Sequence, residues 1–340
     1  MLEIYKEYAK KVFNISSPTG YTIECINYIY DEVKNMGFKV SKSNKGNLKV
    51  EIEGKDHSKV VATSAHVDTL GLMVRSITSK GTLNVTKLGG PLIPSYDGEY
   101  CTVRNRDGKL FTGTVLSTSP SVHVFKDAAT KPRDIDNVEI RLDEVVKNAE
   151  DVKKLGIEAG DFVFIDPKFQ ITESGFLKTR FIDDKGCVCI LLTILKMIKE
   201  GKVTPHYDTI MYFVVHEEVG HGAAVLDERI SEFVTMDMGC VGLDLNGDET
   251  KVSICAKDSG GPYDYELTDR LVKLAKANNI DYVVDIFPFY GSDIGAAYGA
   301  GHDIKGALIG PGVCASHGME RTHLNGIKNS MNLMIKYLED

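Results

Sequence analysis

The sequence places histidine and carboxylate residues directly after apolar runs in two stretches. "YFVVHEEVGHGAA" carries His216, Glu217 and Glu218 after its apolar start, and "KVVATSAHVD" ends in His66 and Asp68. Neighbouring carboxylates that are removed from water repel one another, so they need a proton or a cation. Imidazole and carboxylate groups are common ligands of divalent transition metals. The two stretches therefore indicate metal chemistry.

Further residues of the same types occur in three other stretches. Asp183 and Asp184 stand in the loop before a predicted helix, Asp244 ends "GLD", and His317 follows "GALIGPGVCAS". Taken singly, each residue has an ordinary alternative, because an aspartate before a helix is often an N-cap and a lone histidine is often a hydrogen-bonded polar residue. Together they favour a site for two divalent ions, Zn²⁺ or Co²⁺, and the donor set also admits Mn²⁺.

The elements that must position these residues are those of an α/β domain. Residues 21–36 have apolar side chains at helical spacing, and the run that ends at His66 is typical of a strand buried on both faces. Later strands are predicted at 207–215, 240–245, 251–260, 282–289 and 305–310. In open α/β sheets ligands bind outside the carboxyl ends of the strands, which is where the polar residues fall.

The pattern changes between about residues 75 and 166. Short strands alternate there with turns such as "SKGT", "LGGP" and "RNRDGK", and only "LDEVVKNAEDVKKLG" is predicted to be helical. We therefore predict an α/β protein with a mixed-sheet α/β/α domain, made of residues 1–74 and 167–340. A small β-rich, barrel-like domain of residues 75–166 is inserted into it.

Composition and charge exclude other classes of protein. A hydrophobic content of 43% and a charged content of 26% are ordinary for a globular chain, and a net charge of −8 argues against a nucleic-acid binder. No apolar stretch approaches the roughly 20 residues that span a bilayer, and the N-terminal residues lack a signal-peptide pattern. The seven scattered cysteines predict reduced thiols. We expect a cytoplasmic protein that binds neither nucleic acid nor membrane.

Several motifs together carry a family resemblance. "AHVDTLG", "FIDDKG", "HEEVGHGA", "GLDL" and "GSDIGAA" occur in this order along the chain. They resemble the tetrahedral (TET-type) co-catalytic metallo-aminopeptidases, which are often described as glutamyl aminopeptidases or endoglucanases. The likeness covers nearly the whole chain, including "LGGPLIP" and "GIEAGDFVFID" in the inserted part. Each motif is weak alone, and the set is specific.

The resemblance implies a role for each residue of the site. The implied ligands are His66 and Asp244 for one metal, Glu218 and His317 for the other, and Asp183 as a bridge. Asp68 would orient the imidazole of His66, and Glu217 would be the general base toward a water shared by metals about 3.5–4 Å apart. Ser292 and Asp293 are implied as substrate contacts, with a tight loop of small residues as the equal alternative.

Some positions depart from the family pattern or have rivals. The last motif reads "SHGMERTH", so His323 competes with His317, and Asp237 in "TMDMG" is a weaker rival of Asp244. His216 and Lys185 replace the residues usual in relatives, and packing is the expected role of His216. Asp184 is expected to be an N-cap or a support for the following turn.

The resemblance implies an aminopeptidase that removes N-terminal residues from short peptides. The alternatives are an N-deacylase, dipeptidase or carboxypeptidase that uses the same site, and a non-catalytic scaffold with the same fold. In relatives the inserted domain mediates dimer contacts, so a homo-oligomer is expected, either a dimer or a twelve-subunit particle built from dimers.

Overall fold

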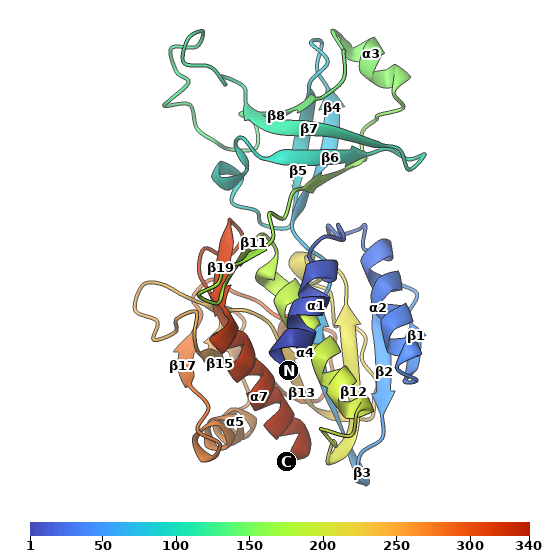
Figure 1. Ribbon diagram of the computed structural model, residues 1–340, viewed down its shortest axis with the longest axis vertical. Helices are drawn as coiled ribbons and strands as arrows, with labels where there is room; N and C mark the ends of the chain where they lie inside the picture. The colour runs from blue at the N-terminus through green and yellow to red at the C-terminus, as the bar shows by residue number, and fades with distance from the viewer.

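A ten-stranded mixed sheet forms the centre of the larger part of the molecule (Figure 1). The computed structural model describes all residues from Met1 to Asp340. The strands of the sheet are β1 (Lys39–Lys42), β2 (Leu48–Ile52), β3 (Asp56–His66), β12 (Tyr207–Val214), β13 (Ile230–Met236), β14 (Gly239–Cys240), β15 (Val252–Asp258), β16 (Gly261–Pro262), β17 (Tyr282–Ile286) and β18 (Lys305–Val313). Their order is β1-β2-β12-β3-β13-β18-β15-β16, with β14 paired to β18 and β17 paired to β15.

Four central strands of this sheet are parallel. β3 pairs in parallel with β12 and with β13, and β13 pairs in parallel with β18. Their carboxyl ends therefore meet at one edge of the sheet. Alternate residues serve opposite faces, since Val61 and Met211 belong to one apolar core while Ala62 and Ile210 belong to another.

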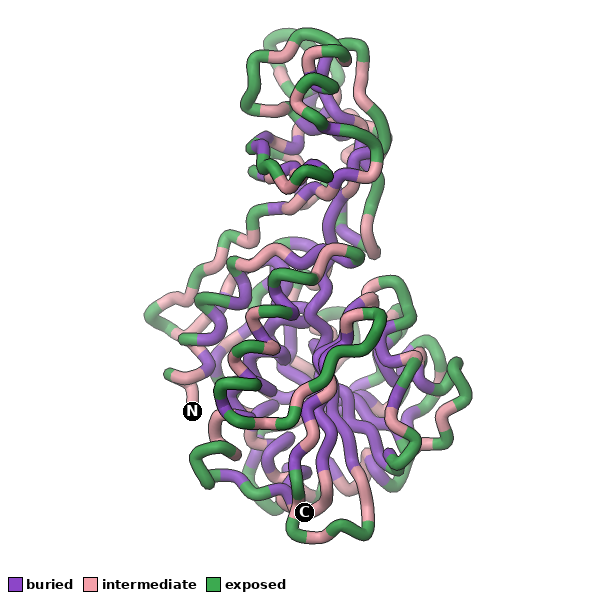
Figure 2. Tube along the Cα trace, turned by 90° about the vertical axis from the view of Figure 1, so that its right-hand side faces the viewer, coloured by how far each residue is buried: buried purple, intermediate pink, exposed green.

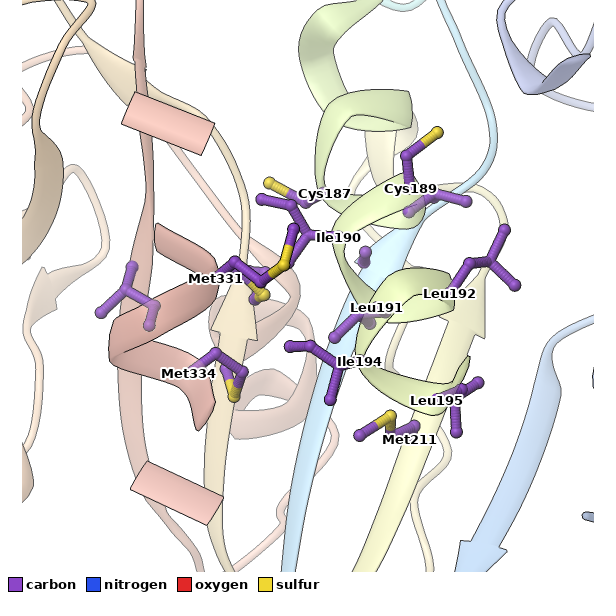
Figure 3. Close-up of a cluster of buried hydrophobic side chains, with 14 of the residues drawn as sticks. Cys187, Cys189, Ile190, Leu191, Leu192, Ile194, Leu195, Met211, Met331 and Met334 are labelled. Carbon is purple, nitrogen blue, oxygen red and sulfur yellow. The ribbon is translucent and has the colours of Figure 1, made fainter. Parts of the chain in front are cut away.

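Helices cover one face of the sheet more heavily than the other. The helices of this part are α1 (Leu2–Val12), α2 (Ile23–Asn35), α4 (Ile182–Lys199), α5 (Tyr265–Ala277), α6 (Asp293–Gly299) and α7 (Leu324–Glu339). All of them except α6 contribute to the largest core, and α6 packs on the opposite face. Figure 3 shows apolar side chains of α4, including Ile190 and Ile194, beside Met331 and Met334 of α7. None of the helices combines the length and hydropathy that crossing a bilayer requires.

The smaller part of the molecule is a closed barrel at the top of Figure 1. Its strands are β4 (Gly71–Ile77), β5 (Leu83–Leu88), β6 (Tyr100–Arg104), β7 (Leu110–Ser117), β8 (Val138–Leu142) and β9 (Phe162–Ile165), in the closed order β4-β5-β8-β7-β6-β9. The short helix α3 (Ala149–Lys154) and a 3-10 turn, η1 (Ile93–Tyr96), complete it. The barrel has its own apolar core, and Figure 2 shows buried strands inside exposed loops in both parts. The predicted fold class, a mixed α/β domain with a barrel-like insertion, is confirmed.

A small three-stranded sheet lies where the two parts meet. It consists of β10 (Gln170–Ile171), β11 (Phe176–Thr179) and β19 (Glu320–His323). The barrel strands begin at Gly71, before the expected boundary at residue 75. The division into domains at residues 75 and 166 stays a prediction.

Two sequence-based expectations for secondary structure were wrong. The predicted helix in "LDEVVKNAEDVKKLG" shortens to α3, which Asn148 caps by accepting a hydrogen bond from the backbone of Asp151. Of the two valines before it, Val146 packs partly against the barrel core while Val145 is almost fully exposed, so they do not form one buried helical face. The strand predicted at 240–245 is also absent beyond β14, because Gly242 and Leu243 have positive φ and turn the chain.

Candidate metal centre

The parallel edge of the sheet gathers most of the residues expected at the site. His66 is the last residue of β3, and Glu217 and Glu218 form a 3-10 turn, η2 (Glu217–Val219), just after β12. His317 follows β18, and Asp183 stands at the start of α4, where the backbone departs from helical geometry. The Asp183–Asp184 peptide bond is cis.

Asp183 lies between two imidazole rings. Its Oδ1 atom is 2.9 Å from Nε2 of His66, and its Oδ2 atom is 3.4 Å from Nε2 of His317. Each carboxylate oxygen thus faces a different histidine. This arrangement has the form of a carboxylate that bridges two cations, each held by one imidazole nitrogen.

Backbone carbonyls fix the orientation of both imidazole rings. Nδ1 of His66 donates to the backbone oxygen of Asp68 over 2.8 Å, and Nδ1 of His317 donates to the backbone oxygen of Gly90 over 2.9 Å. These donations place a proton on Nδ1 and direct Nε2 of each ring at Asp183, so Nε2 is the nitrogen that could bind a metal. A histidine ligand of a metal requires this tautomer.

Asp68 supports the site differently from the expectation. Its carboxylate is 3.8 Å from the ring nitrogen of His66, too far for a hydrogen bond. It accepts instead from the backbone N–H groups of Glu217 (3.1 Å) and Glu218 (3.4 Å), and from the hydroxyl of Thr19 (2.8 Å). The fully buried carboxylate therefore holds the turn that carries both glutamates, while the backbone of Asp68 orients the imidazole.

The structure brings Asp237, and not Asp244, to the cluster. Asp244 is exposed in a turn and is absent from the lining of the cavity at the sheet edge. Asp237 directly follows β13, is 3% exposed, and has a carboxylate oxygen within 4.8 Å of the ligand atoms of His66 and Asp184. Strand β13 was overlooked in the sequence and the next strand was predicted too late, and the choice between the two aspartates as ligand stays a prediction.

The cluster buries several carboxylates side by side, which disfavours their ionised forms. Burial, followed by the charge of Asp183, raises the pKa of Asp237 to about 8. Burial also raises the pKa values of Glu217 and Glu218 well above the usual range, with neighbouring carboxylates adding to the shift. Oε1 of Glu218 is buried without a hydrogen-bond partner. A divalent cation would neutralise these groups, so the donor set fits a metal.

Ligand atoms come close enough for metal binding in two groups. One group is His66, Asp183 and Glu218, and the other is His66, Asp184 and Asp237. Asp184 is partly committed, because its Oδ2 atom accepts from the backbone N–H of His66 over 3.0 Å. It thus supports the end of β3 and is not an N-cap, whereas Asp183 lines the cavity.

A cavity of about 390 Å³ opens next to the cluster. Its lining comprises Asp183, Glu217, Glu218, Gly220, Asp237, Asp258, Gly260, Phe289, Tyr290, Gly291, Ser292, Gly295, Ala296 and His317. Ser292 is present, as expected for a substrate contact, although its Oγ atom accepts from Ile294 and lies 2.8 Å from the hydroxyl of Tyr263.

Asp293 does not line this cavity, and its expected contact with substrate stays a prediction. Its carboxylate accepts from the backbone of Ala223 over 3.0 Å and from the hydroxyl of Ser64 over 3.0 Å. A Cβ atom at Gly222 would lie 2.4 Å from Oδ1 of Asp293. Asp293 therefore fixes the loop after Glu218, and glycine is required at 222 by this close approach.

Residues outside the motifs join the barrel to the site. A Cβ atom at Gly90 would lie 3.3 Å from the ring of His317, so the glycine lets the barrel's connection approach the imidazole. Arg180, buried beneath, donates to the backbone oxygens of Ser95 (2.6 Å) and Gly318 (3.1 Å). Glu320 accepts from the backbone N–H groups of Asp183 and His317. The sequence analysis did not identify Gly90, Arg180 or Glu320 as residues of the site. Only the motif "SHGMERTH", which contains Glu320, offered a signal.

The remaining candidates lie away from the cluster. His323 caps α7 and donates to the backbone of Ser174, so it is no rival of His317. His216 stacks on His221 with ring centroids 5.2 Å apart. The buried ammonium of Lys185 donates to the backbone oxygens of Val12 and Ile15.

An acidic cluster with two histidines lies at the carboxyl edge of a mixed sheet, an arrangement typical of α/β metal-dependent hydrolases. Comparisons with known proteins give the family. The sequence model described as M42 glutamyl aminopeptidase matches residues 46–333. The YhfE protein of Bacillus subtilis (strain 168) is 43% identical over 334 residues, which cover 98% of this chain and 96% of that protein.

Solved structures share the fold. Aminopeptidase APDkam598 of the archaeon Desulfurococcus kamchatkensis superposes with a TM-score of 0.87 at 22% identity, covering 98% of this chain and 94% of that one. The TET1 peptidase of Pyrococcus horikoshii gives a TM-score of 0.86 at 24% identity, covering 99% of each chain. The chain belongs to the M42 glutamyl aminopeptidase family and is a peptidase. The predicted resemblance to TET-type aminopeptidases and the prediction of a peptide-bond hydrolase are thus confirmed.

Proposed function

We propose that the protein is an aminopeptidase with two divalent metal ions per chain and with Glu217 as general base. The observation that carries this proposal is the position of Asp183, whose two oxygens face Nε2 of His66 and Nε2 of His317. The proposed ligands are His66 and Asp237 at one position, Glu218 and His317 at the other, and Asp183 between them. Zn²⁺ and Co²⁺ suit this set of nitrogen and oxygen donors, which also admits Mn²⁺.

Divalent ions held there would supply Lewis-acid polarisation of the scissile carbonyl and would lower the pKa of a water molecule. Glu217 suits the transfer of the proton. Its Oε2 atom is 3.7 Å from Nε2 of His66, its side chain lines the cavity, and Asp68 fixes its backbone. Glu217 accepts a proton from the attacking water and delivers it to the departing amine nitrogen as the C–N bond breaks. Ser292 forms part of the cavity wall, where its Oγ atom accepts a hydrogen bond from Ile294 and lies 2.8 Å from the hydroxyl of Tyr263.

Asp68 and Gly90 orient the two imidazoles and the turn that carries the two glutamates. The backbone of Asp68 and that of Gly90 set the two imidazoles, and the carboxylate of Asp68 sets the turn with both glutamates. The site therefore needs little rearrangement to hold its ligands, which favours precise placement of the scissile bond.

Substitution of the two competing aspartates tests the ligand set. Asp237→Asn should lower metal affinity by more than about 100-fold, since a ligand is worth at least as much as its supporting contacts. The matched variant Asp244→Asn should bind metal like the unaltered protein. The measurement is metal content after equilibrium dialysis, with hydrolysis of leucine p-nitroanilide as second readout. Metal loss in Asp244→Asn with retention in Asp237→Asn would reject the assignment.

The substrates proposed are short peptides with a free N-terminus. An N-deacylase, dipeptidase or carboxypeptidase would use the same cluster, and only the position of the free terminus separates them.

The TET1 peptidase of Pyrococcus horikoshii can assemble into a tetrahedron or a large octahedral shell. We accordingly propose a homo-oligomer that uses the barrel, which sedimentation would reveal as a mass above the 37.4 kDa of one chain. All seven cysteines are free, which agrees with a cytoplasmic location.

A further inference from the structure

Asp258 is a buried carboxylate of the cavity that the proposed mechanism does not use. It ends β15, is 5% exposed, and lines the same cavity as the metal cluster. No lysine, arginine or histidine lies within ion-pair distance of its carboxylate. The ammonium of the neighbouring Lys257 donates to the backbone oxygen of Asp258 over 2.8 Å. A buried acid without a cationic partner is uncommon and calls for a role.

Two hydrogen bonds hold this carboxylate in one orientation. Its Oδ1 atom accepts from the backbone N–H of Gly260 over 2.8 Å, and its Oδ2 atom accepts from the hydroxyl of Tyr263 over 2.7 Å. The hydroxyl of Tyr263 lies in turn 2.8 Å from Oγ of Ser292. Each carboxylate oxygen can accept more than one hydrogen bond, so Asp258 keeps acceptor capacity toward the cavity.

Asp258 differs from the other carboxylates of the cavity lining because it would have no counter-charge when metal is bound. Two divalent cations would balance the four carboxylates of the cluster end, which are Asp183, Glu217, Glu218 and Asp237. His317 is neutral when its Nε2 atom binds a metal. Asp258 then remains as the single lining charge without a counter-charge, because no lysine or arginine lines the cavity.

The shape of the cavity provides room for a long side chain. Beyond the cluster the wall consists largely of small residues, including Gly260, Gly291, Gly295 and Ala296. A substrate with its scissile carbonyl at the cluster would direct its N-terminal side chain into this space. A volume of about 390 Å³ lies within the range of small-ligand sites.

We infer that Asp258 selects substrates whose N-terminal residue is lysine or arginine and disfavours glutamate and aspartate. This inference rests on the proposed aminopeptidase function and names its substrate class. A lysine ammonium would donate a charge-assisted hydrogen bond to the oriented carboxylate, whereas an acidic side chain would meet like charge at a wall without cations. The family is named for glutamyl substrates, whereas the charge of this cavity lining favours basic N-terminal residues.

Lysine, leucine and glutamate p-nitroanilides, assayed with metal restored, test the inference. The unaltered protein should show kcat/KM for lysine above that for leucine, and for leucine above that for glutamate. Asp258→Asn should lower the ratio of lysine to leucine by at least about tenfold. The exposed control Asp303→Asn makes the same change in charge and should leave both ratios unaltered.

A binding measurement separates the inference from the chemistry. Calorimetry on metal-loaded Glu217→Gln, with and without Asp258→Asn, compares lysinamide and leucinamide, and loss of the lysine preference in the double variant supports the inference. A glutamate substrate cleaved faster than lysine, or a lysine preference unchanged in Asp258→Asn, would overturn it. Failure to cleave any free-amine substrate would overturn the proposed function itself.

Discussion

Glu217 and Glu218 are neighbours in sequence and have different surroundings. Oε2 of Glu218 lies 3.9 Å from Nε2 of His317, and Oε2 of Glu217 lies 3.7 Å from Nε2 of His66. Both backbone N–H groups donate to the carboxylate of Asp68, so the turn is fixed while the side chains diverge. This geometry permits a ligand and a base to come from adjacent positions.

Removal of the proposed base should stop turnover without releasing metal. Glu217→Gln keeps the size of the side chain and loses the ability to accept a proton at neutral pH, so we expect kcat to fall about 10²–10⁴-fold. Metal content should equal that of the unaltered protein. Glu228→Gln, at an exposed position outside the cavity, is the control. Full activity of Glu217→Gln would assign the base to another residue.

Elements far apart in the chain meet at the site. Strands β3, β12, β13 and β18 bring their carboxyl ends to one edge, and the connection after β5 brings Gly90 to His317. Arg180 links these layers, since it donates to Ser95 in the barrel and to Gly318 beside the proposed ligand, and stacks 4.7 Å over the ring of Tyr96. The barrel therefore contributes directly to the position of His317, a proposed metal ligand.

Loss of Arg180 should weaken both stability and metal binding. Arg180→Met keeps much of the apolar stem and leaves the backbone oxygens of Ser95 and Gly318 without a charged donor, at a cost of about 3 kcal/mol in the free energy of unfolding. The exposed control Arg75→Met breaks a surface pair with Asp136 and should cost less than about 1 kcal/mol. Urea unfolding and zinc titration measure the two effects. Equal stability of both variants would contradict this role of Arg180.

A strand that the sequence analysis missed explains why Asp244 was preferred to Asp237 there. Strand β13 contains Glu232, a buried charged residue, next to the exposed Ser231. Its carboxylate pairs with Lys59 and Arg270, which come from distant segments, so the run "ISEFVTM" lacked a continuous apolar pattern. Without this strand, the aspartate at its end, Asp237, had no strand end to follow. The predicted ligand moved to Asp244.

Other parts of the site were readable because their signals are local. Apolar runs ending at His66 and before Glu217 reveal buried parallel strands, and Asp183 precedes an apolar helix. The contacts of Gly90, Arg180 and Asp258 depend on pairings across the fold, which no single stretch contains. The sequence therefore predicts the class of site well and predicts its supporting and selective residues poorly.

At the scale of the whole molecule, the barrel projects from the sheet domain and has a separate apolar core (Figure 1). A loop of the barrel exposes apolar side chains, with Val122 72% and Val124 74% accessible in the single chain. Exposed apolar residues of this kind are typical of contacts between subunits. This agrees with the proposed homo-oligomer, in which the barrel both joins subunits and supports the metal centre.

The proposed aminopeptidase hydrolyses the peptide bond after a free N-terminal residue, and this hydrolysis depends on bound metal. The most direct measurement compares leucine p-nitroanilide with its N-acetylated form, using metal-stripped protein to which Zn²⁺, Co²⁺ or Mn²⁺ is restored. We expect no turnover without metal, turnover of the free-amine substrate with at least one of these ions, and none of the acetylated one. Hydrolysis that survives metal removal, or that prefers the acetylated substrate, would contradict it.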